Sequence, residues 1–407
     1  MAGEDRSGQL GSTTGGAPVH RRSRRRRLLF ALVSILAVLV LGDLAVRGVL
    51  ALRGRPVGEL SARYRSGRRF RQQGQWQLYD ANHPYLPYVL RPNLDLTIIF
   101  DNAIPTGIPG TNYPNPQGYR EIPLHLVTNS AGLRGPEVRP EKPTDGFRVV
   151  CLGGSTTQGY YEDADTYPRQ LETMLRRRLP GRTVEVLNAG VQGYSTAESL
   201  VNFEFRLLPY RPDVVIVYHG MNDLKASLAP GFRSDYAHWR RDLLPPRPLA
   251  VDRLPVWLDV SAIYVLSREA VLARSRKTQW QRSLYDAWPD FQSDLAGLEA
   301  FRSNLRSIVA VARASGVSPI LATFYYWPMV DTPEARKTAR GISSQNEVVC
   351  ALGRELGVPV ADIAQEMPGD ASLTFDGIHF TPEGNRVRAE ILLRTLEQSG
   401  IISPRVD

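Results

Sequence analysis

The chain has 407 residues, of which 43% are hydrophobic and 22% are charged. This composition is too apolar for a disordered protein, and the length allows no more than two or three domains. Two cysteines exclude a disulfide framework and a zinc site built from four thiolates. The net charge of +9 resides in residues 1–27 and 53–71, which carry +5 and +6, so residues 72–407 carry −2. A nucleic-acid-binding protein would hold its basic surface on the folded body, so no nucleic-acid partner is expected.

An apolar segment between the two basic stretches is predicted to be a transmembrane signal-anchor over residues 28–50. Residues 28–42 are apolar or small, and the run resumes beyond Asp43 and Arg47, which gives enough length to cross the hydrocarbon core. Asp43 and Arg47 are expected near the far interface, or with their charged groups reaching it. No clear A-x-A cleavage site follows, which favours an uncleaved anchor over a removed signal peptide.

The orientation of this segment follows from its flanks. The arginines of the basic tail, residues 1–27, adjoin the apolar run more tightly than those of residues 53–71. The positive-inside rule then places the N-terminus in the cytoplasm and the body outside. The sequence therefore predicts a single-pass protein of the cell membrane with an extracytoplasmic body.

Three regions are predicted beyond the anchor. Residues 51–90, rich in Arg and Gln without sustained periodicity, are expected to form a juxtamembrane linker. Residues 91–145 combine short β-like runs with many Pro and Gly, which predicts a small β-rich appendage. From 146 to 400, short apolar runs alternate with amphipathic stretches, a pattern typical of a parallel sheet covered on both faces. The expected strands are 147–152, 183–187, 213–218, 318–324 and 358–363, and the expected helices are 167–179, 196–208, 297–314, 343–356 and one after Pro382.

Residues 225–296 interrupt this alternation with sequence rich in Trp, Pro and Arg. They are predicted to be a long insertion that serves as a lid or as a surface for a protein partner. Four tryptophans of this insertion either form such a surface or pack in the core: Trp239, Trp257, Trp280 and Trp288.

Turns with polar residues or glycine follow three predicted strands, and ligands of open α/β sheets bind at the carboxyl ends of strands. Ser155, in Gly-Gly-Ser-Thr-Thr, is either an exposed nucleophile or the N-cap of a tight turn. The N–H of Gly193 can face an oxyanion, or the glycines merely make the turn. The Asn222 amide can donate to developing negative charge, although Asn-Asp is also ordinary turn chemistry.

A fourth loop holds Asp376 and His379, with Gly377 between them to supply a bend. The carboxylate would accept from one ring nitrogen and leave the other to deprotonate a serine. A metal site at this pair lacks further obvious ligands, and the start of the following helix is the purely structural alternative. His219 is interpreted as a packing residue, and the other four histidines lie in the predicted tail, linker, appendage and insertion.

These residues occur in the order Ser155, Gly193, Asn222 and Asp376–His379. In that order they resemble the four blocks of the SGNH hydrolase superfamily, the GDSL-type esterases and lipases, over about residues 146–398. The chain has Gly-Gly-Ser-Thr where the commonest first block reads Gly-Asp-Ser-Leu, so no substrate subclass is carried over from the lipases. The absence of Gly-x-Ser-x-Gly around the serine argues against an α/β-hydrolase elbow.

The resemblance implies a three-layer α/β/α fold with a parallel flavodoxin-like sheet, and a serine esterase that acts on acetyl or short-chain acyl esters. Ser155 would be the nucleophile, His379 the base and Asp376 its partner. The N–H groups of Ser155 and Gly193 and the amide of Asn222 would form the oxyanion hole. No metal or organic cofactor is expected.

Two alternatives to an esterase stay open. An O-acyltransferase shares the first half-reaction, and a non-catalytic scaffold tethered to the membrane can retain the fold. Residues 127–135 resemble the lead-in of membrane-anchored bacterial members. The predicted location of the body outside the membrane, together with the family resemblance, makes acylated small molecules, glycans or lipids of the cell envelope the expected substrates. Cys151 and Cys350 are expected to be buried thiols, although an oxidising compartment would permit a disulfide.

Overall fold

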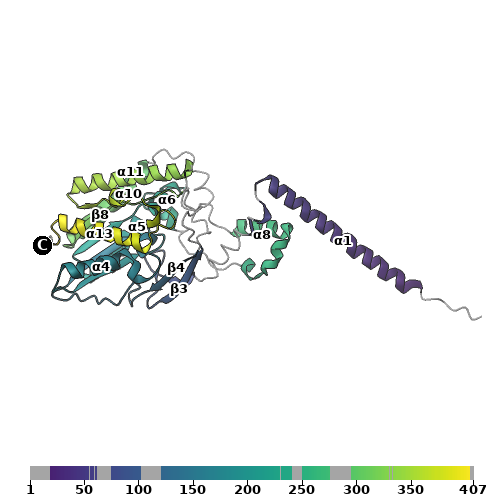
Figure 1. The fold of residues 1–407 in the computed structure, drawn as a ribbon, viewed down its shortest axis with the longest axis horizontal. Coiled ribbons are helices and arrows are strands. Elements are labelled where there is room, and N and C mark those ends of the chain that lie inside the picture. Colours follow the sequence, from purple (N-terminus) through teal and green to yellow (C-terminus); the bar gives the residue numbers. More distant parts are fainter. Residues whose placement is uncertain are drawn as a thin grey trace, which may run out of the picture. The chain divides into compact units, whose positions relative to one another are not determined.

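The computed structural model of this chain divides into two compact units (Figure 1). Residues 1–62 and 255–273 form the N-terminal unit, and residues 63–254 and 274–407 form the large unit. The residues that the structure describes are 19–54, 56–58, 60–61, 75–101, 121–229, 231–240, 250–275, 295–329, 331 and 333–403.

A parallel sheet of five strands forms the centre of the large unit, in the order β6-β5-β7-β8-β9. Every residue of β5 and β7 is buried, because helices cover both faces, and both strands are mainly apolar. The exception is Arg148 of β5, whose buried guanidinium forms an ion pair with Glu185. Val149 of β5 lies opposite Val186 of β6 and Val214 of β7. The strand order is that of flavodoxin-like sheets, which confirms the predicted fold class. The strands are β5 (Phe147–Gly153), β6 (Val184–Gly190), β7 (Val214–Tyr218), β8 (Ser318–Ala322) and β9 (Val360–Ala361).

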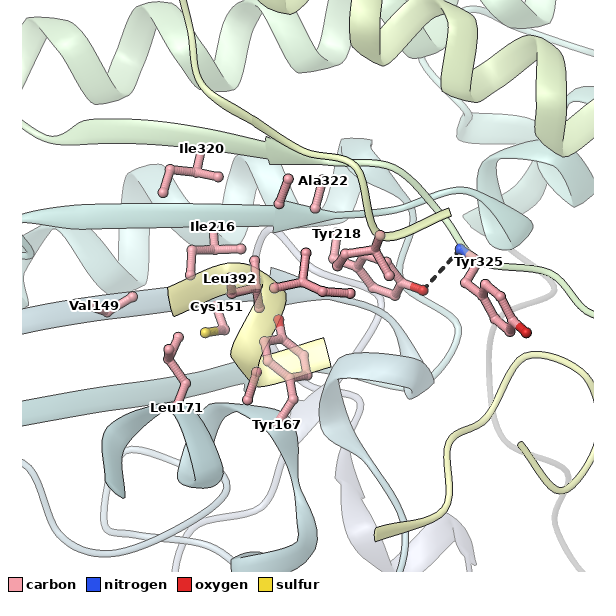
Figure 2. Packing of buried hydrophobic residues seen from close by; sticks show 14 of the residues in the cluster. Val149, Cys151, Tyr167, Leu171, Ile216, Tyr218, Ile320, Ala322, Tyr325 and Leu392 are labelled. Carbon is pink, nitrogen blue, oxygen red and sulfur yellow. Dashed lines mark hydrogen bonds between the residues drawn. The ribbon is translucent and has the colours of Figure 1, made fainter. Parts of the chain in front are cut away.

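Alternate residues of the strands point to two separate apolar layers. Figure 2 shows the first layer, where Cys151 and Ile216 pack with Leu171 of α4 and Leu392 of α13. The second layer joins the opposite faces of the strands to α10 and α11. Both cysteines are free; Cys151 is buried as expected, whereas Cys350 is only partly buried. Burial raises the pKa of the Cys151 thiol to about 12. The helices of the large unit are α3 (Ser155–Gln158), η2 (Asp163–Asp165), α4 (Tyr167–Arg178), α5 (Thr196–Asn202), η3 (Phe203–Leu207), η4 (Leu208–Tyr210), α6 (Met221–Leu228), α7 (Ala237–Arg240), η5 (Ala250–Arg253), α10 (Leu295–Ala314), α11 (Pro333–Leu356), α12 (Ile363–Glu366), η8 (Ala371–Leu373) and α13 (Pro382–Gln398).

Two helices differ from the sequence expectation at their ends. The helix predicted over 196–208 is α-helical only to Asn202 and continues as a π-helical turn and a short 3₁₀ turn. Pro209 lies in that last turn, where the missing N–H cannot extend an α-helix. The helix predicted from 343 begins at Pro333, because proline suits the first turn of a helix even where the following residues lack a clear apolar period.

Residues 75–101 and 121–127 pack onto the loops at one edge of the sheet. They contain η1 (Gln75–Leu78), a two-stranded pair β1 (Tyr79–Asp80) and β2 (Val89–Leu90), and a hairpin of β3 (Asp95–Asp101) and β4 (Glu121–Val127). Their buried side chains share one apolar cluster with Tyr160, Val191, Tyr194 and Phe375. Residues 75–90, expected in the linker, thus contribute buried side chains next to the turns that follow β5 and β6.

The N-terminal unit contains α1 (Val19–Leu52), η6 (Val256–Val260) and α8 (Ala262–Ser275). In α1, Arg24–Leu52 is long and apolar enough to cross a membrane, and an 18-residue window within it has a mean hydropathy of 2.6. Asp43 and Arg47 of α1 form an ion pair with 2.9 Å between Oδ2 and Nε. Trp257 of η6 is 72% exposed, whereas Trp239 of the large unit is buried, and the other two tryptophans of the predicted insertion, Trp280 and Trp288, lie outside the described residues.

Candidate active site

The four turns singled out in the sequence meet at one edge of the sheet. Ser155 begins α3 directly after β5, and Gly193 lies in the turn after β6. Asn222 is the second residue of α6, which follows β7. Because β6, β5 and β7 are parallel neighbours, their carboxyl ends share an edge, which is where open α/β sheets bind ligands.

A chain of hydrogen bonds joins Ser155, His379 and Asp376. Ser155 Oγ lies 2.8 Å from His379 Nε2, and His379 Nδ1 lies 2.6 Å from Asp376 Oδ2. The second carboxylate oxygen accepts from the backbone N–H groups of Ile378 and His379, at 3.1 and 2.8 Å. Asp376 and His379 are buried, whereas Ser155 is partly accessible to solvent. The imidazole is therefore held next to a hydroxyl that a substrate can approach.

The loop that carries Asp376 and His379 is a tight, closed turn. The Phe375 N–H donates to the His379 carbonyl over 3.0 Å, and Gly377 between them adopts a φ of +91°. A side chain there would meet the Trp327 carbonyl at 2.3 Å. Glycine therefore supplies the bend expected from the sequence, and the two catalytic candidates come together through local chain geometry.

Two buried arginines hold the carbonyls of the short helix α3, and the sequence analysis did not identify either. Arg134 donates to the carbonyls of Gln158 and Gly159 over 2.9 and 2.8 Å. Arg388 donates to the Thr156 carbonyl over 2.8 Å and its guanidinium lies 4.0 Å from the centre of the Tyr167 ring. Burial lowers the pKa of Arg134 to about 10, which leaves it charged at neutral pH. These charged donors satisfy helix-end carbonyls and so fix the turn that presents Ser155.

Three hydrogen-bond donors surround the space next to Ser155. Asn222 Nδ2 donates one hydrogen to the Tyr194 carbonyl over 2.9 Å, which orients the amide and leaves its second hydrogen available. A Cβ atom at Gly154 would lie 2.5 Å from the same nitrogen, so the amide sits directly against the nucleophile turn. Among the described residues, the backbone N–H groups of Ser155 and Gly193 have no acceptor. The set has the composition of an oxyanion hole.

A second serine–histidine pair lies deeper in the fold. His219 Nε2 is 2.8 Å from Ser199 Oγ and His219 Nδ1 is 3.7 Å from Asp223 Oδ2. All three residues are buried, and burial lowers the pKa of His219 to about 3, so the ring is neutral. Asp223 also accepts from the Thr196 N–H at the start of α5. This agrees with the interpretation of His219 as a packing residue, and the pair ties α5 to α6 beneath the site.

A small pocket opens beside Ser155, with about 250 Å³ of empty space that is partly open to solvent. Its walls combine Asn222 and the nucleophile turn with the apolar side chains of Met221, Phe324 and Ile378. Most of this space is continuous with solvent, and the part enclosed next to the serine is small.

Comparison with known proteins gives one family and a set of solved structures. The family model of the GDSL-like Lipase/Acylhydrolase family matches residues 151–387, which include Ser155, Gly193, Asn222, Asp376 and His379. No curated protein matches the chain.

Three solved structures illustrate the similarity. An alpha/beta hydrolase enzyme from the metagenome of Lake Arreo, Spain, has 18% identity and a TM-score of 0.39, and the match covers 65% of this chain and 99% of that chain. The lipase/acylhydrolase from Enterococcus faecalis has 19% identity and a TM-score of 0.39, and the match covers 64% of this chain and 100% of that chain. A catalytic mutant of an acetylxylan esterase from Geobacillus stearothermophilus has 16% identity and a TM-score of 0.40, and the match covers 63% of this chain and 96% of that chain.

Proposed function

Because the chain belongs to the GDSL-like lipase/acylhydrolase family and is an ester-hydrolysing enzyme, we propose that it cleaves short acyl esters through a covalent intermediate on Ser155. The observation that carries this proposal is the unbroken chain of hydrogen bonds from Ser155 Oγ through the His379 ring to Asp376. Such a chain activates a hydroxyl that is otherwise a weak nucleophile at neutral pH.

In the first half-reaction, Ser155 Oγ attacks the ester carbonyl while His379 Nε2 takes the hydroxyl proton. Asp376 holds the ring in the tautomer that presents Nε2 as acceptor, and it stabilises the imidazolium that forms. The negative charge on the carbonyl oxygen is held by the N–H groups of Ser155 and Gly193 and by the amide of Asn222. Collapse of the tetrahedral intermediate expels the alcohol, which receives its proton from His379.

In the second half-reaction, water loses a proton to His379 and attacks the acyl-enzyme carbonyl. The same donors hold the second oxyanion, Ser155 recovers the proton and the carboxylic acid leaves. If a sugar hydroxyl takes the place of water, the same residues transfer the acyl group instead. The difference lies in which acceptor reaches the acyl-enzyme.

We expect activity to decline as the acyl chain lengthens, because the enclosed space beside Ser155 is small. With purified protein, kcat/KM for 4-nitrophenyl acetate should exceed that for 4-nitrophenyl dodecanoate by on the order of 10- to 100-fold. Free acetate should be the product, measured with and without an oligosaccharide acceptor. Rates that rise with chain length would contradict the short-chain assignment, and an acylated acceptor without free acid would indicate transfer.

The proposed location is the cell membrane, with α1 as a single anchor and the large unit outside. Residues 28–50 of α1 span about 35 Å as a helix, enough for the hydrocarbon core. The tight arginine cluster at their N-terminal side favours a cytoplasmic N-terminus. In this location, acylated glycans or lipids of the envelope are the substrates within reach.

The pairing of Asp43 and Arg47 supports this anchor, because charged side chains within a membrane-spanning helix are costly unless they are paired. Besides its ion pair with Arg47, Asp43 Oδ1 accepts from Ser261 Oγ at 2.8 Å and from the Ile263 N–H at 3.1 Å. Arg47 also donates to the Val260 carbonyl. The start of α8 thus satisfies both charges at the outer end of the span.

The same segment of the N-terminal unit leaves an apolar surface uncovered. Trp257, Val260 and Leu266 are 72%, 73% and 45% exposed. Tryptophan beside aliphatic residues is typical of a segment that lies at the boundary between headgroups and acyl chains. Because the Val260 carbonyl accepts a hydrogen bond from Arg47 of the anchor, we assign these side chains to the outer lipid interface.

We expect acyl chains to quench the fluorescence of Trp257 when the full chain is reconstituted in vesicles of brominated phosphatidylcholine and phosphatidylglycerol. Trp257→Phe should remove this quenched component, whereas Trp239→Phe should leave it unchanged, because Trp239 is buried in the large unit. Equal quenching in wild type and Trp257→Phe would contradict the lipid-facing surface. Release of the full chain by a carbonate wash would contradict the anchor itself.

A further inference from the structure

We propose that Tyr88 is a positioning residue for the oxyanion hole, which it serves by holding the peptide between Gln192 and Gly193 in one orientation. The inference rests on the role proposed above for the Gly193 N–H. Tyr88 belongs to the segment before β2, outside the region 151–387 that matches the family. The segment predicted as a linker would therefore take part in building the site.

The central observation is a single hydrogen bond. The Tyr88 hydroxyl donates to the backbone carbonyl of Gln192. That carbonyl and the Gly193 N–H belong to the same peptide unit, which is planar and trans, so the two groups point in opposite directions. A donor that holds the carbonyl on one side therefore directs the N–H to the other side.

The local turn makes this orientation a choice between two states. The Tyr194 N–H donates to the Val191 carbonyl over 3.0 Å, so residues 191–194 form a β-turn with Gln192 and Gly193 in its centre. Gly193 has a φ of +85°, as the third residue of a type II turn requires. Type I differs mainly by rotation of this central peptide through about half a turn, which would direct the Gly193 N–H away from its present side.

Tyr88 is itself firmly placed. Its side chain is buried and its ring packs against Tyr79 and Tyr194, with centroids 4.8 and 5.7 Å away. The Tyr194 hydroxyl donates back to the Tyr88 carbonyl. Burial holds the pKa of the Tyr88 hydroxyl well above its usual value, so it stays protonated and remains a donor.

The opposite side of the turn is held by the nucleophile helix. The Gln192 N–H donates to Gln158 Oε1 over 2.8 Å, and Gln158 is the last residue of α3. The two peptides that flank Gln192 are thus fixed from different elements, one by α3 and the other by Tyr88. Of the two, Tyr88 holds the peptide that carries the Gly193 N–H.

The test is Tyr88→Phe with Tyr79→Phe as its matched control. Tyr79 loses the same hydroxyl from a similarly buried ring, but that hydroxyl donates to the Gln192 side chain, at 3.0 Å from Oε1, and not to the peptide. Loss of one hydrogen bond that biases the peptide should lower kcat by about tenfold in Tyr88→Phe, with KM within about twofold of wild type. Tyr79→Phe should keep kcat within about twofold of wild type.

Inhibition by methyl trifluoromethyl ketone supplies a second readout, because the hemiketal that it forms with the serine hydroxyl carries the oxyanion. Its inhibition constant should rise in Tyr88→Phe by the same factor by which kcat falls. A kcat within twofold of wild type in Tyr88→Phe, equal losses in both variants, or a change in KM alone would each overturn the proposal.

Crystal structures of wild type and Tyr88→Phe test the orientation without any reaction. The Gln192–Gly193 peptide should be in one orientation in wild type and turned in at least part of the molecules of the variant. An unchanged peptide in Tyr88→Phe would overturn the positioning role even if the esterase assignment holds. A turned peptide in a protein that cleaves no ester would instead overturn the proposed function and retain the structural role of Tyr88.

Discussion

Replacing Ser155 by alanine is expected to lower kcat for ester hydrolysis by about 10⁶-fold, since loss of the nucleophile removes the covalent route altogether. The variant should fold as wild type does, because Ser155 is partly accessible and its hydroxyl is hydrogen-bonded to the His379 ring at the surface of the site. The measurement is hydrolysis of 4-nitrophenyl acetate together with labelling by a fluorophosphonate probe, which reacts only with an activated serine. Labelling should disappear in Ser155→Ala and also in His379→Ala, because the base is then missing.

Ser199→Ala is the matched control for this experiment. Ser199 is also hydrogen-bonded to a histidine, with 2.8 Å between Oγ and His219 Nε2, yet the whole pair is buried beneath the site. Its removal should leave labelling and turnover at the level of wild type. Labelling that persists in Ser155→Ala, or that is lost in Ser199→Ala, would contradict the assignment of the nucleophile. No labelling of folded wild type would favour the scaffold alternative.

Asn222→Ala is expected to lower kcat by on the order of 10²- to 10³-fold while KM changes little, the usual cost of one lost oxyanion donor. The Asn222 amide is held against the nucleophile turn by its bond to the Tyr194 carbonyl, so its second hydrogen is oriented before substrate arrives. Such a donor acts mainly on the charge of the transition state, which is why the loss falls on kcat.

Asn222→Asp tests the same role with almost no change in volume. The carboxylate places an acceptor and a negative charge where the oxyanion develops, so this variant should be at least as impaired as Asn222→Ala. The thermal midpoint of both variants should be compared with that of wild type to separate loss of activity from loss of folding. Near-wild-type turnover of either variant would exclude Asn222 from the oxyanion hole.

Much of the sheet was predictable because buried parallel strands leave a strong local pattern. The run over 147–152 is apolar except for Arg148, and β5 extends only one residue further, to Gly153. Helix limits were less predictable where the chain departs from regular α-geometry. The change to π-helical and 3₁₀ turns after Asn202, and the start of α11 at Pro333, depend on packing and hydrogen bonding that no apolar period records.

The placement of the site residues at one edge was also predictable, since Ser155, Gly193 and Asn222 each follow a strand of a parallel sheet. The Asp376–His379 pair is local, and a glycine between its members makes their contact a matter of turn geometry. Length and apolar composition were likewise sufficient to identify the helix that can span a membrane. All of these are properties of short segments.

Only the folded chain identifies the residues that support those segments. Arg388 donates to the Thr156 carbonyl from 232 positions away, and Tyr88 reaches the Gln192 carbonyl across 104 positions. The partners of Asp43 and Arg47 at Val260, Ser261 and Ile263 lie 213 to 220 positions away in the sequence. Such contacts depend on how separate elements pack, and neither periodicity nor residue spacing along the chain encodes the direction of a distant side chain.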